Sequence, residues 1–152
     1  MNDVLVWLHG DCLNPHGPAL QAHADAPRVF VFDEALLTQY RLSLKRLAFL
    51  YECLLEIPRV EIRKGDVAAE LAAAAREYDC SRIVTAESVA PRFAQIRAAL
   101  QREYDLTVEV VALEPFIELS STEAARLDLK RFSRYWNPLK ARALSLNQSF
   151  DW

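Results

Sequence analysis

The sequence contains little glycine, three residues in 152. Loops that bind nucleotide phosphates need glycines, because backbone N–H groups must approach the phosphate closely at a helix N-terminus. The first apolar run, Val4 to Leu8, is followed by Gly10 and Gly17, which do not form a G-x-G-x-x-G motif, and no G-K-[ST] motif occurs anywhere. We therefore expect neither ordinary NAD binding nor hydrolysis of nucleoside triphosphates.

Cysteine is also scarce. Cys12, Cys53 and Cys80 are odd in number and form no C-x-x-C pair, which is typical of reduced thiols in a cytoplasmic protein and disfavours a metal cluster. No basic segment precedes Val4, and the apolar run there is too short for a signal sequence or a membrane span. We expect a soluble, cytoplasmic protein without a membrane partner.

The chain has no large excess of positive charge. Its net charge is -3, which excludes a nucleic-acid binder held by bulk electrostatics. The segment 126–142 is different, because it carries six cationic side chains against Asp128 alone. Aromatic side chains lie between these cations, as in proteins that bind single-stranded nucleic acid. The spacing of Leu129, Phe132, Trp136 and Leu139 also fits a buried stripe, so we favour buried aromatic rings and keep a nucleic-acid accessory role as an alternative.

Five short apolar runs alternate with helical patterns along the chain. Each run is rich in β-branched or aromatic residues, as are strands buried on both faces. Strict alternation of strand and helix predicts a parallel sheet covered on both sides. The fold class predicted is therefore α/β, a Rossmann-like five-stranded parallel sheet whose strands lie at Val4–Leu8, Val29–Phe32, Val60–Ile62, Ile83–Thr85 and Val108–Leu113.

The helices between these runs carry start and stop signals. Pro58 ends a predicted helix over Ser43–Ile57, Asp66 is placed to cap one over Val67–Tyr78, and Pro91 fits the first turn of the next. Their predicted inner stripes are Leu44, Leu47, Leu50, Tyr51, Leu54 and Leu55, then Val67, Leu71, Ala74 and Tyr78, then Phe93, Ile96, Leu100 and Tyr104.

The C-terminal part also contains capping signals. Ser120 and Glu123 have capping-box spacing before a predicted helix over Ala124–Trp136. Asn137 and Pro138 then predict the start of a final short helix that ends near residue 146. We expect a single domain over residues 1–146, followed by a polar tail at 147–152.

Ligands of open parallel sheets bind beyond the carboxyl ends of the strands. The residues expected there are His9, Gly10, Asp11, Asp33, Glu87 and Arg92. His9 and Asp11 could form an acid/base pair, and Arg92 could meet an anionic ligand. Asp33 could bind a ribose hydroxyl or simply form a turn. His9, His16 and His23 are spaced seven apart, but the intervening prolines and Gly17 break a helix there, so we expect no metal site.

Five segments resemble the N-terminal domain of the photolyase/cryptochrome family. "VLVWLHGDCLNPHGPAL" resembles its opening strand and the loop R-R-D-L-R-x-x-D-N-P-A-L, with Trp7, Asp11 and Leu13 in matching places. "VFVFDEALL" resembles the second strand, and "KRLAFLYECLLEI" the helix R-x-x-F-L-x-E-S-L. "EIRKGDVAAEL" resembles the third strand with its G-D turn, and "FSRYWNPLKARAL" the closing F-T-x-F-W segment.

The resemblance implies a domain that holds an antenna chromophore, such as a pterin, flavin or deazaflavin, or none at all. His9 and Gly10 stand where the family loop has two arginines, Asp33 matches the family's second-strand aspartate, and Glu87 stands near the family's pocket carboxylate. The flavin-bearing helical domain of the family is not expected in these 152 residues. A catalytic FAD site and DNA-repair activity are therefore not expected either.

We therefore predict a stand-alone photolyase-like α/β domain that acts as a binding or partner module rather than as an enzyme. Its expected partner is a second copy or a separate flavin-bearing chain, and the predicted contact residues are Arg131, Arg134, Tyr135 and Trp136. Two alternatives remain open. One is a nucleotide-using enzyme that acts through His9, Asp11 and Asp33, and the other is a nucleic-acid or DNA-repair accessory protein that uses the basic segment 126–142.

Overall fold

The computed structural model describes residues 3–39, 42–113, 115 and 117–146. It divides into two compact units, Met1–Leu113 (unit 1) and Glu114–Trp152 (unit 2), and each is described by itself. The expectation of one domain over residues 1–146 stays a prediction. The predicted tail at 147–152 lies outside the described residues.

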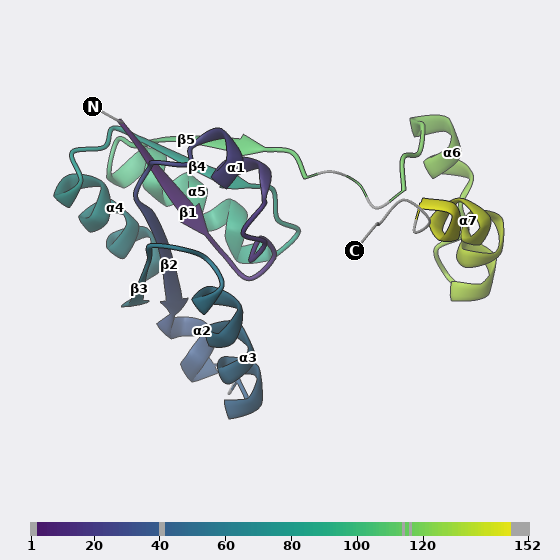
Figure 1. Cartoon of the computed structure of the whole chain (residues 1–152), viewed down its shortest axis with the longest axis horizontal. Helices are drawn as coiled ribbons and strands as arrows, with labels where there is room; N and C mark the ends of the chain where they lie inside the picture. Colours follow the sequence, from purple (N-terminus) through teal and green to yellow (C-terminus); the bar gives the residue numbers. More distant parts are fainter. Residues whose placement is uncertain (1–2, 40–41, 114, 116, 147–152) are drawn as a thin grey trace. The chain divides into compact units, whose positions relative to one another are not determined.

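Unit 1 contains the predicted five-stranded parallel sheet (Figure 1). The strand order is β3-β2-β1-β4-β5, so the chain builds outward from β1 on one side and then on the other. All four neighbouring pairs are parallel, which confirms the predicted fold class. The strands are β1 (Val4–Leu8), β2 (Arg28–Asp33), β3 (Val60–Gly65), β4 (Arg82–Ala86) and β5 (Thr107–Val111).

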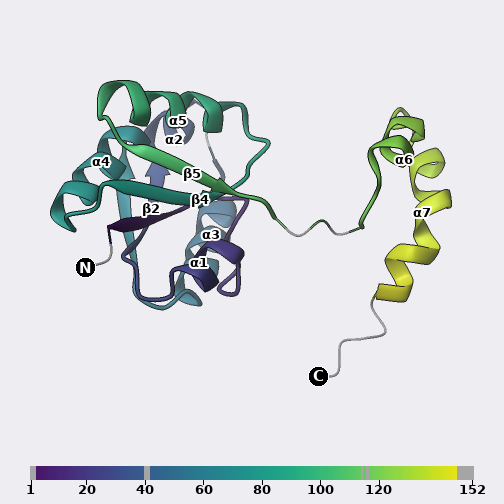
Figure 2. The ribbon, with the colours of Figure 1, turned by 90° about the horizontal axis from the view of Figure 1, so that it is seen from above.

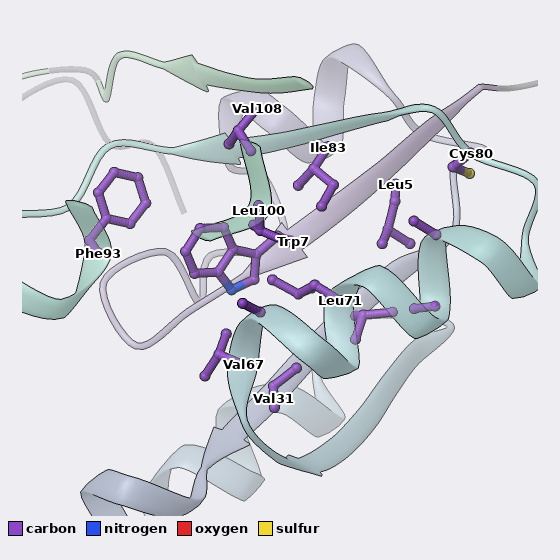
Figure 3. Packing of buried hydrophobic residues seen from close by; sticks show 14 residues of the cluster. Leu5, Trp7, Val31, Val67, Leu71, Cys80, Ile83, Phe93, Leu100 and Val108 are labelled. Atoms are coloured by element: carbon purple, nitrogen blue, oxygen red, sulfur yellow. The ribbon is translucent and has the colours of Figure 1, made fainter. Parts of the chain in front are cut away.

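The central strand β1 is buried on both faces, as its unbroken apolar run predicts. Leu5 and Trp7 point into one hydrophobic cluster, whereas Val4, Val6 and Leu8 point into another, because successive side chains of a strand alternate between faces. Helices α4 (Val67–Glu77) and α5 (Pro91–Glu103) supply side chains to the first cluster (Figure 3). Helices α1 (Pro18–Ala22) and α3 (Leu44–Leu55) cover the opposite face (Figure 2).

The local signals for helices in unit 1 are largely confirmed. Ser43 caps α3 through the N–H of Arg46, Asp66 caps α4 through the N–H of Ala69, and Pro91 occupies the first turn of α5. The helices of unit 1 are α1 (Pro18–Ala22), α2 (Glu34–Gln39), α3 (Leu44–Leu55), α4 (Val67–Glu77) and α5 (Pro91–Glu103).

The predicted inner stripes are wrong at several positions. Tyr78 and Tyr104 are exposed at the C-terminal caps of α4 and α5, where the helix no longer faces the sheet. In α3 only Leu54 is buried, and Leu44, Tyr51 and Leu55 are exposed. The reason is geometric: α3 carries apolar residues around much of its circumference, and one side of it is enough to cover the sheet.

Unit 2 consists of α6 (Ser121–Arg126) and α7 (Phe132–Leu146). The capping box of Ser120 and Glu123 is confirmed. The predicted helix over Ala124–Trp136 is wrong, because the carboxylate of Asp128 accepts the N–H of Lys130 and forms a turn that competes with the helix. The predicted break at Asn137 and Pro138 is also wrong, since Pro138 lies inside α7.

No helix among residues 3–39, 42–113 and 117–146 is both long enough and apolar enough to cross a bilayer.

Candidate functional site

A cavity of about 380 Å³ opens in unit 1 at the carboxyl ends of β1 and β2. Strand ends, the N-terminal part of α5 and the pair α2 and α3 surround it, and Figure 1 shows α2 and α3 next to each other at the end of β2. Most of its lining is apolar. The polar lining side chains are His9, Asp11, Asp33, Arg46, Ser88 and Arg92.

Aromatic rings form one wall of the cavity. Trp7 and Phe93 are stacked, with ring centroids 5.3 Å apart and an interplanar angle of 18°. The imidazole of His9 meets both rings edge-on, at 5.5 Å from Trp7 and 5.4 Å from Phe93. Trp7 and Phe93 are both almost fully buried, and Figure 3 shows them side by side in the core. This wall is therefore held rigidly by the packing of β1 against α5.

The turn after β1 has no glycine-rich loop. Hydrogen bonds between Cys12 and His9 hold it together. Cys12 donates its backbone N–H to the carbonyl of His9 at 3.0 Å, and its sulfur accepts the His9 N–H at 3.2 Å. Burial raises the pKa of the Cys12 thiol to about 11, against the opposing effect of its hydrogen bond to His9. The side chain is therefore a protonated thiol at neutral pH and holds the turn together.

Both ring nitrogens of His9 have hydrogen-bond partners. Nδ1 accepts the backbone N–H of Asp11 at 3.3 Å, and Nε2 lies 3.0 Å from the carbonyl oxygen of Ala86. Because a carbonyl can only accept, Nε2 carries the proton in this arrangement. The imidazole ties β1 to β4, and the predicted acid/base pair with the Asp11 carboxylate is not formed.

The carboxylate of Asp11 is instead hydrogen-bonded to Ser88. The Ser88 hydroxyl donates to Asp11 Oδ2, and its oxygen accepts the N–H of Ala90 at the start of α5. Gly10 lines the same edge of the cavity, and a Cβ at that position would meet no other atom within 4 Å. A side chain at position 10 would therefore have open space beside the turn.

Asp33 and Arg92 form an ion pair across the cavity. Arg92 Nε donates to Asp33 Oδ2 at 2.6 Å, and Asp33 Oδ1 accepts the N–H groups of Ala35 and Leu36 at the start of α2. Asp33 is 8% exposed. Residues 59 positions apart are thereby joined, and two predicted site residues, one at the end of β2 and one in the first turn of α5, meet directly.

Glu87 directly follows β4 and faces the segment after β5 instead of the cavity. Its carboxylate accepts the N–H of Leu113 at 3.0 Å, and it does not line the cavity. The predicted partner-binding residues lie together around the start of α7: Arg131 and Arg134 are exposed, and Tyr135 and Trp136 are half-buried. Arg134 pairs with Asp128 at 2.9 Å. A role in partner binding for these four residues stays a prediction.

The expectation of buried aromatic rings in this segment is wrong for Phe132. Its ring is 71% exposed and stacks on Trp136 with centroids 5.8 Å apart. Leu129 is exposed as well, because it falls in the turn before α7 and not on the helix.

Sequence reasoning missed Arg46, Leu42 and Leu50, which line the cavity from α3 and the residues before it. The sequence carries no signal for this, since α3 follows β2 and α2 and its contact with the strand ends depends on how the helices pack. Among the residues that the structure describes, no group of three or more His, Cys, Asp or Glu side chains could hold a metal ion.

One comparison with a solved structure supports the fold. The chain is similar to a class III photolyase from Agrobacterium tumefaciens, with a TM-score of 0.54 and 20% identity over 92% of this chain and 32% of the photolyase. A second solved structure, the hypothetical protein PH0823, has a TM-score of 0.41 and 13% identity, over 81% of this chain and 100% of that one. No protein-family model matches the chain. No curated protein matches it either. The chain thus has the fold of a photolyase α/β domain and spans about a third of the photolyase's length.

Proposed function

We propose that unit 1 is a photolyase-like module that binds a planar heteroaromatic small molecule, of the pterin, flavin or deazaflavin kind, in the cavity at the ends of β1 and β2. The observation that carries this proposal is the cavity itself. Its volume of about 380 Å³ lies within the range of small-molecule sites, which are mostly apolar with a few convergent polar groups.

The polar groups of the cavity suit a ligand that is aromatic and carries an anionic or hydrogen-bonding substituent. The Asp33 carboxylate neutralises Arg92 at 2.6 Å. Arg46 also lines the cavity and has no ion-pair partner among the described residues. Its planar guanidinium can stack on a ring or pair with a carboxylate or phosphate. Trp7 and Phe93 line the cavity and contribute apolar atoms to its wall.

The same contacts favour binding over catalysis for these residues. A general base needs a free lone pair near its substrate, and both nitrogens of His9 and both oxygens of Asp33 are engaged. A nucleophilic cysteine needs a lowered thiol pKa, whereas burial raises that of Cys12 to about 11. We therefore do not assign DNA-repair chemistry to these residues.

The test is to purify the protein from its native host, record its near-ultraviolet and visible absorbance, and identify any released small molecule by mass spectrometry. We expect a bound chromophore. Ala90→Trp places an indole at the edge of the cavity and should lower the affinity for the ligand at least about tenfold, which corresponds to roughly 1.4 kcal/mol. Ala94→Trp is the matched control, because Ala94 is exposed on the same helix and does not line the cavity.

A second measurement, of protein stability with an added compound, tests the proposal if the ligand is lost during purification. A flavin mononucleotide or a folate at one hundred times its Kd should raise the stability of the protein by about 2.7 kcal/mol. A colourless protein that releases no small molecule and gains no stability from either compound would contradict the proposal, and so would equal loss of ligand in the Ala90 and Ala94 variants.

A further inference from the structure

Helix α3 exposes an apolar stripe on the side away from the cavity and the core. Leu44, Ala48, Tyr51 and Leu55 lie on one face, because they follow one another at intervals of four, three and four residues. Their exposure is unusual for apolar side chains: Leu44 is 81% exposed, Tyr51 50% and Leu55 66%. These four residues are called the α3 stripe below.

The α3 stripe is separate from the sides of the helix that have partners in unit 1. Leu54 is buried in the cluster on one face of the sheet, and Arg46 and Leu50 line the cavity. A molecule bound to the stripe would therefore leave the cavity open. Alternation of three and four residues is also the spacing with which two helices pack along a common seam.

The α3 stripe can pack on the α3 stripe of a second copy that runs in the opposite direction, because the side-chain sizes then match. In an antiparallel pair about a two-fold axis, Leu44 of one copy lies beside Leu55 of the other, and the small Ala48 lies beside the large Tyr51. Each contact occurs twice, as in an isologous interface. Pairing of small with large side chains fills the space between two helices without voids.

Charges beside the stripe fit the same arrangement. Lys45 and Glu52 border it on one side, are exposed, and have no ion-pair partner among the described residues. On one helix they are two turns apart, too far to pair with each other. In the antiparallel register, Lys45 of one copy lies within about 3 Å of Glu52 of the other along the helix axis, given a rise of 1.5 Å per residue. The dimer interface therefore contains two Lys45–Glu52 contacts.

From these observations we propose that α3 is a homodimer interface in which the stripe packs antiparallel on the α3 stripe of a second copy. The occupant is this chain itself, because both the size order and the charge order of the stripe are satisfied by its own reversed copy. This proposal does not depend on the proposed ligand.

The test is sedimentation velocity of the full chain over a wide concentration range. We expect a reversible monomer–dimer equilibrium. Leu55→Glu should raise the dimer dissociation constant at least about a hundredfold, because each substitution is present twice in the interface. Val89→Glu is the matched control: Val89 is 99% exposed and lies off the stripe, so this variant should dimerise like the wild type. Leu55 is exposed, and circular dichroism should show both variants folded.

Charge reversal tests the register. Lys45→Glu or Glu52→Lys alone places like charges opposite each other and should weaken the dimer about tenfold or more. The double variant Lys45→Glu with Glu52→Lys restores opposite charges in every contact and should recover the wild-type dissociation constant. A protein that stays monomeric at all concentrations, or a dimer that Leu55→Glu leaves intact, would overturn the proposal. A double variant no tighter than the single ones would overturn the antiparallel register.

Discussion

The two units of the chain are stabilised by different interactions. Unit 1 packs helices on both faces of a sheet, with fully buried side chains such as Leu5, Leu71 and Leu100. In the part of unit 2 that the structure describes, the buried apolar side chains are Leu139 and Ala143. The same part of unit 2 holds a capping box, the ion pair of Arg142 with Glu123 at 3.0 Å, and that of Arg134 with Asp128 at 2.9 Å.

This difference predicts that unit 1 has the larger free energy of unfolding. Burial of apolar surface contributes about 25 cal/mol per Å², whereas exposed ion pairs contribute about 0 to 1 kcal/mol each. Unit 1 should therefore unfold cooperatively as a whole. Unit 2 should open at a lower free energy, because segments with few buried contacts open locally.

The largest expected effect comes from the core of unit 1. Leu71→Ala should lower the free energy of unfolding of unit 1 by about 2 to 5 kcal/mol, because it removes buried apolar atoms and leaves a cavity. Leu139→Ala in unit 2 is the comparison and should lower hydrogen-exchange protection in α7 while leaving that of α4 unchanged. Urea unfolding measures the free energy of unfolding, and hydrogen exchange followed by mass spectrometry shows which unit each variant affects. Equal loss of protection in both units would show that they unfold together.

A smaller effect is expected in alkaline solution, from Cys12. Burial raises its pKa from 9.0 to about 11, so the folded state keeps the thiol proton after the unfolded state has lost it. Stability should therefore fall as the pH rises from 9 to 11, with a contribution from this thiol of up to about 2 kcal/mol. Cys12→Ala removes the titrating group, and its free energy of unfolding should depend less on pH over that interval. An unchanged slope would contradict this assignment.

The smallest expected effect is the loss of one cap in unit 2. The hydroxyl of Ser120 accepts the N–H of Glu123, and the Glu123 carboxylate accepts in return from Ser120, which lowers the pKa of Glu123. Ser120→Ala should destabilise α6 by about 1 kcal/mol. Faster amide exchange confined to residues 121–126 would confirm the local effect. A change in the unfolding of unit 1 of the same size would contradict the separation of the two units.

Short-range signals predicted much of the fold. The caps at Asp66 and Ser120 mark helix starts correctly, because each side chain accepts a free N–H group of the first turn three residues on. Pro91 marks a start correctly because it has no N–H group that would need a partner in the first turn. The α6–α7 boundary could not be predicted in the same way. The carboxylate of Asp128 could equally have faced solvent on a longer helix, and Pro138 is tolerated inside α7.

The sequence predicted where the candidate site lies, but not which of its side chains contact each other. The rule that ligands bind at the carboxyl ends of parallel strands led to His9, Asp11, Asp33 and Arg92, all of which line the cavity. The same rule led to Glu87, which faces Leu113 instead. The pairing of Asp33 with Arg92 depends on where α5 starts relative to β2, and sequence spacing does not contain that distance.

The sequence by itself determined the five strands, the burial of the central strand β1 on both faces and the local caps, since apolar runs and capping residues act over a few positions. The predicted burial of every strand on both faces is wrong for the edge strands β3 and β5, which have a neighbouring strand on one side alone and stay partly exposed. Only the tertiary structure decided which polar side chains neutralise each other, which side of α3 covers the sheet and which side stays exposed. The physical reason is that these outcomes depend on contacts between residues far apart in the chain, such as Asp33 and Arg92, whose energies become defined only when the helices pack on the sheet.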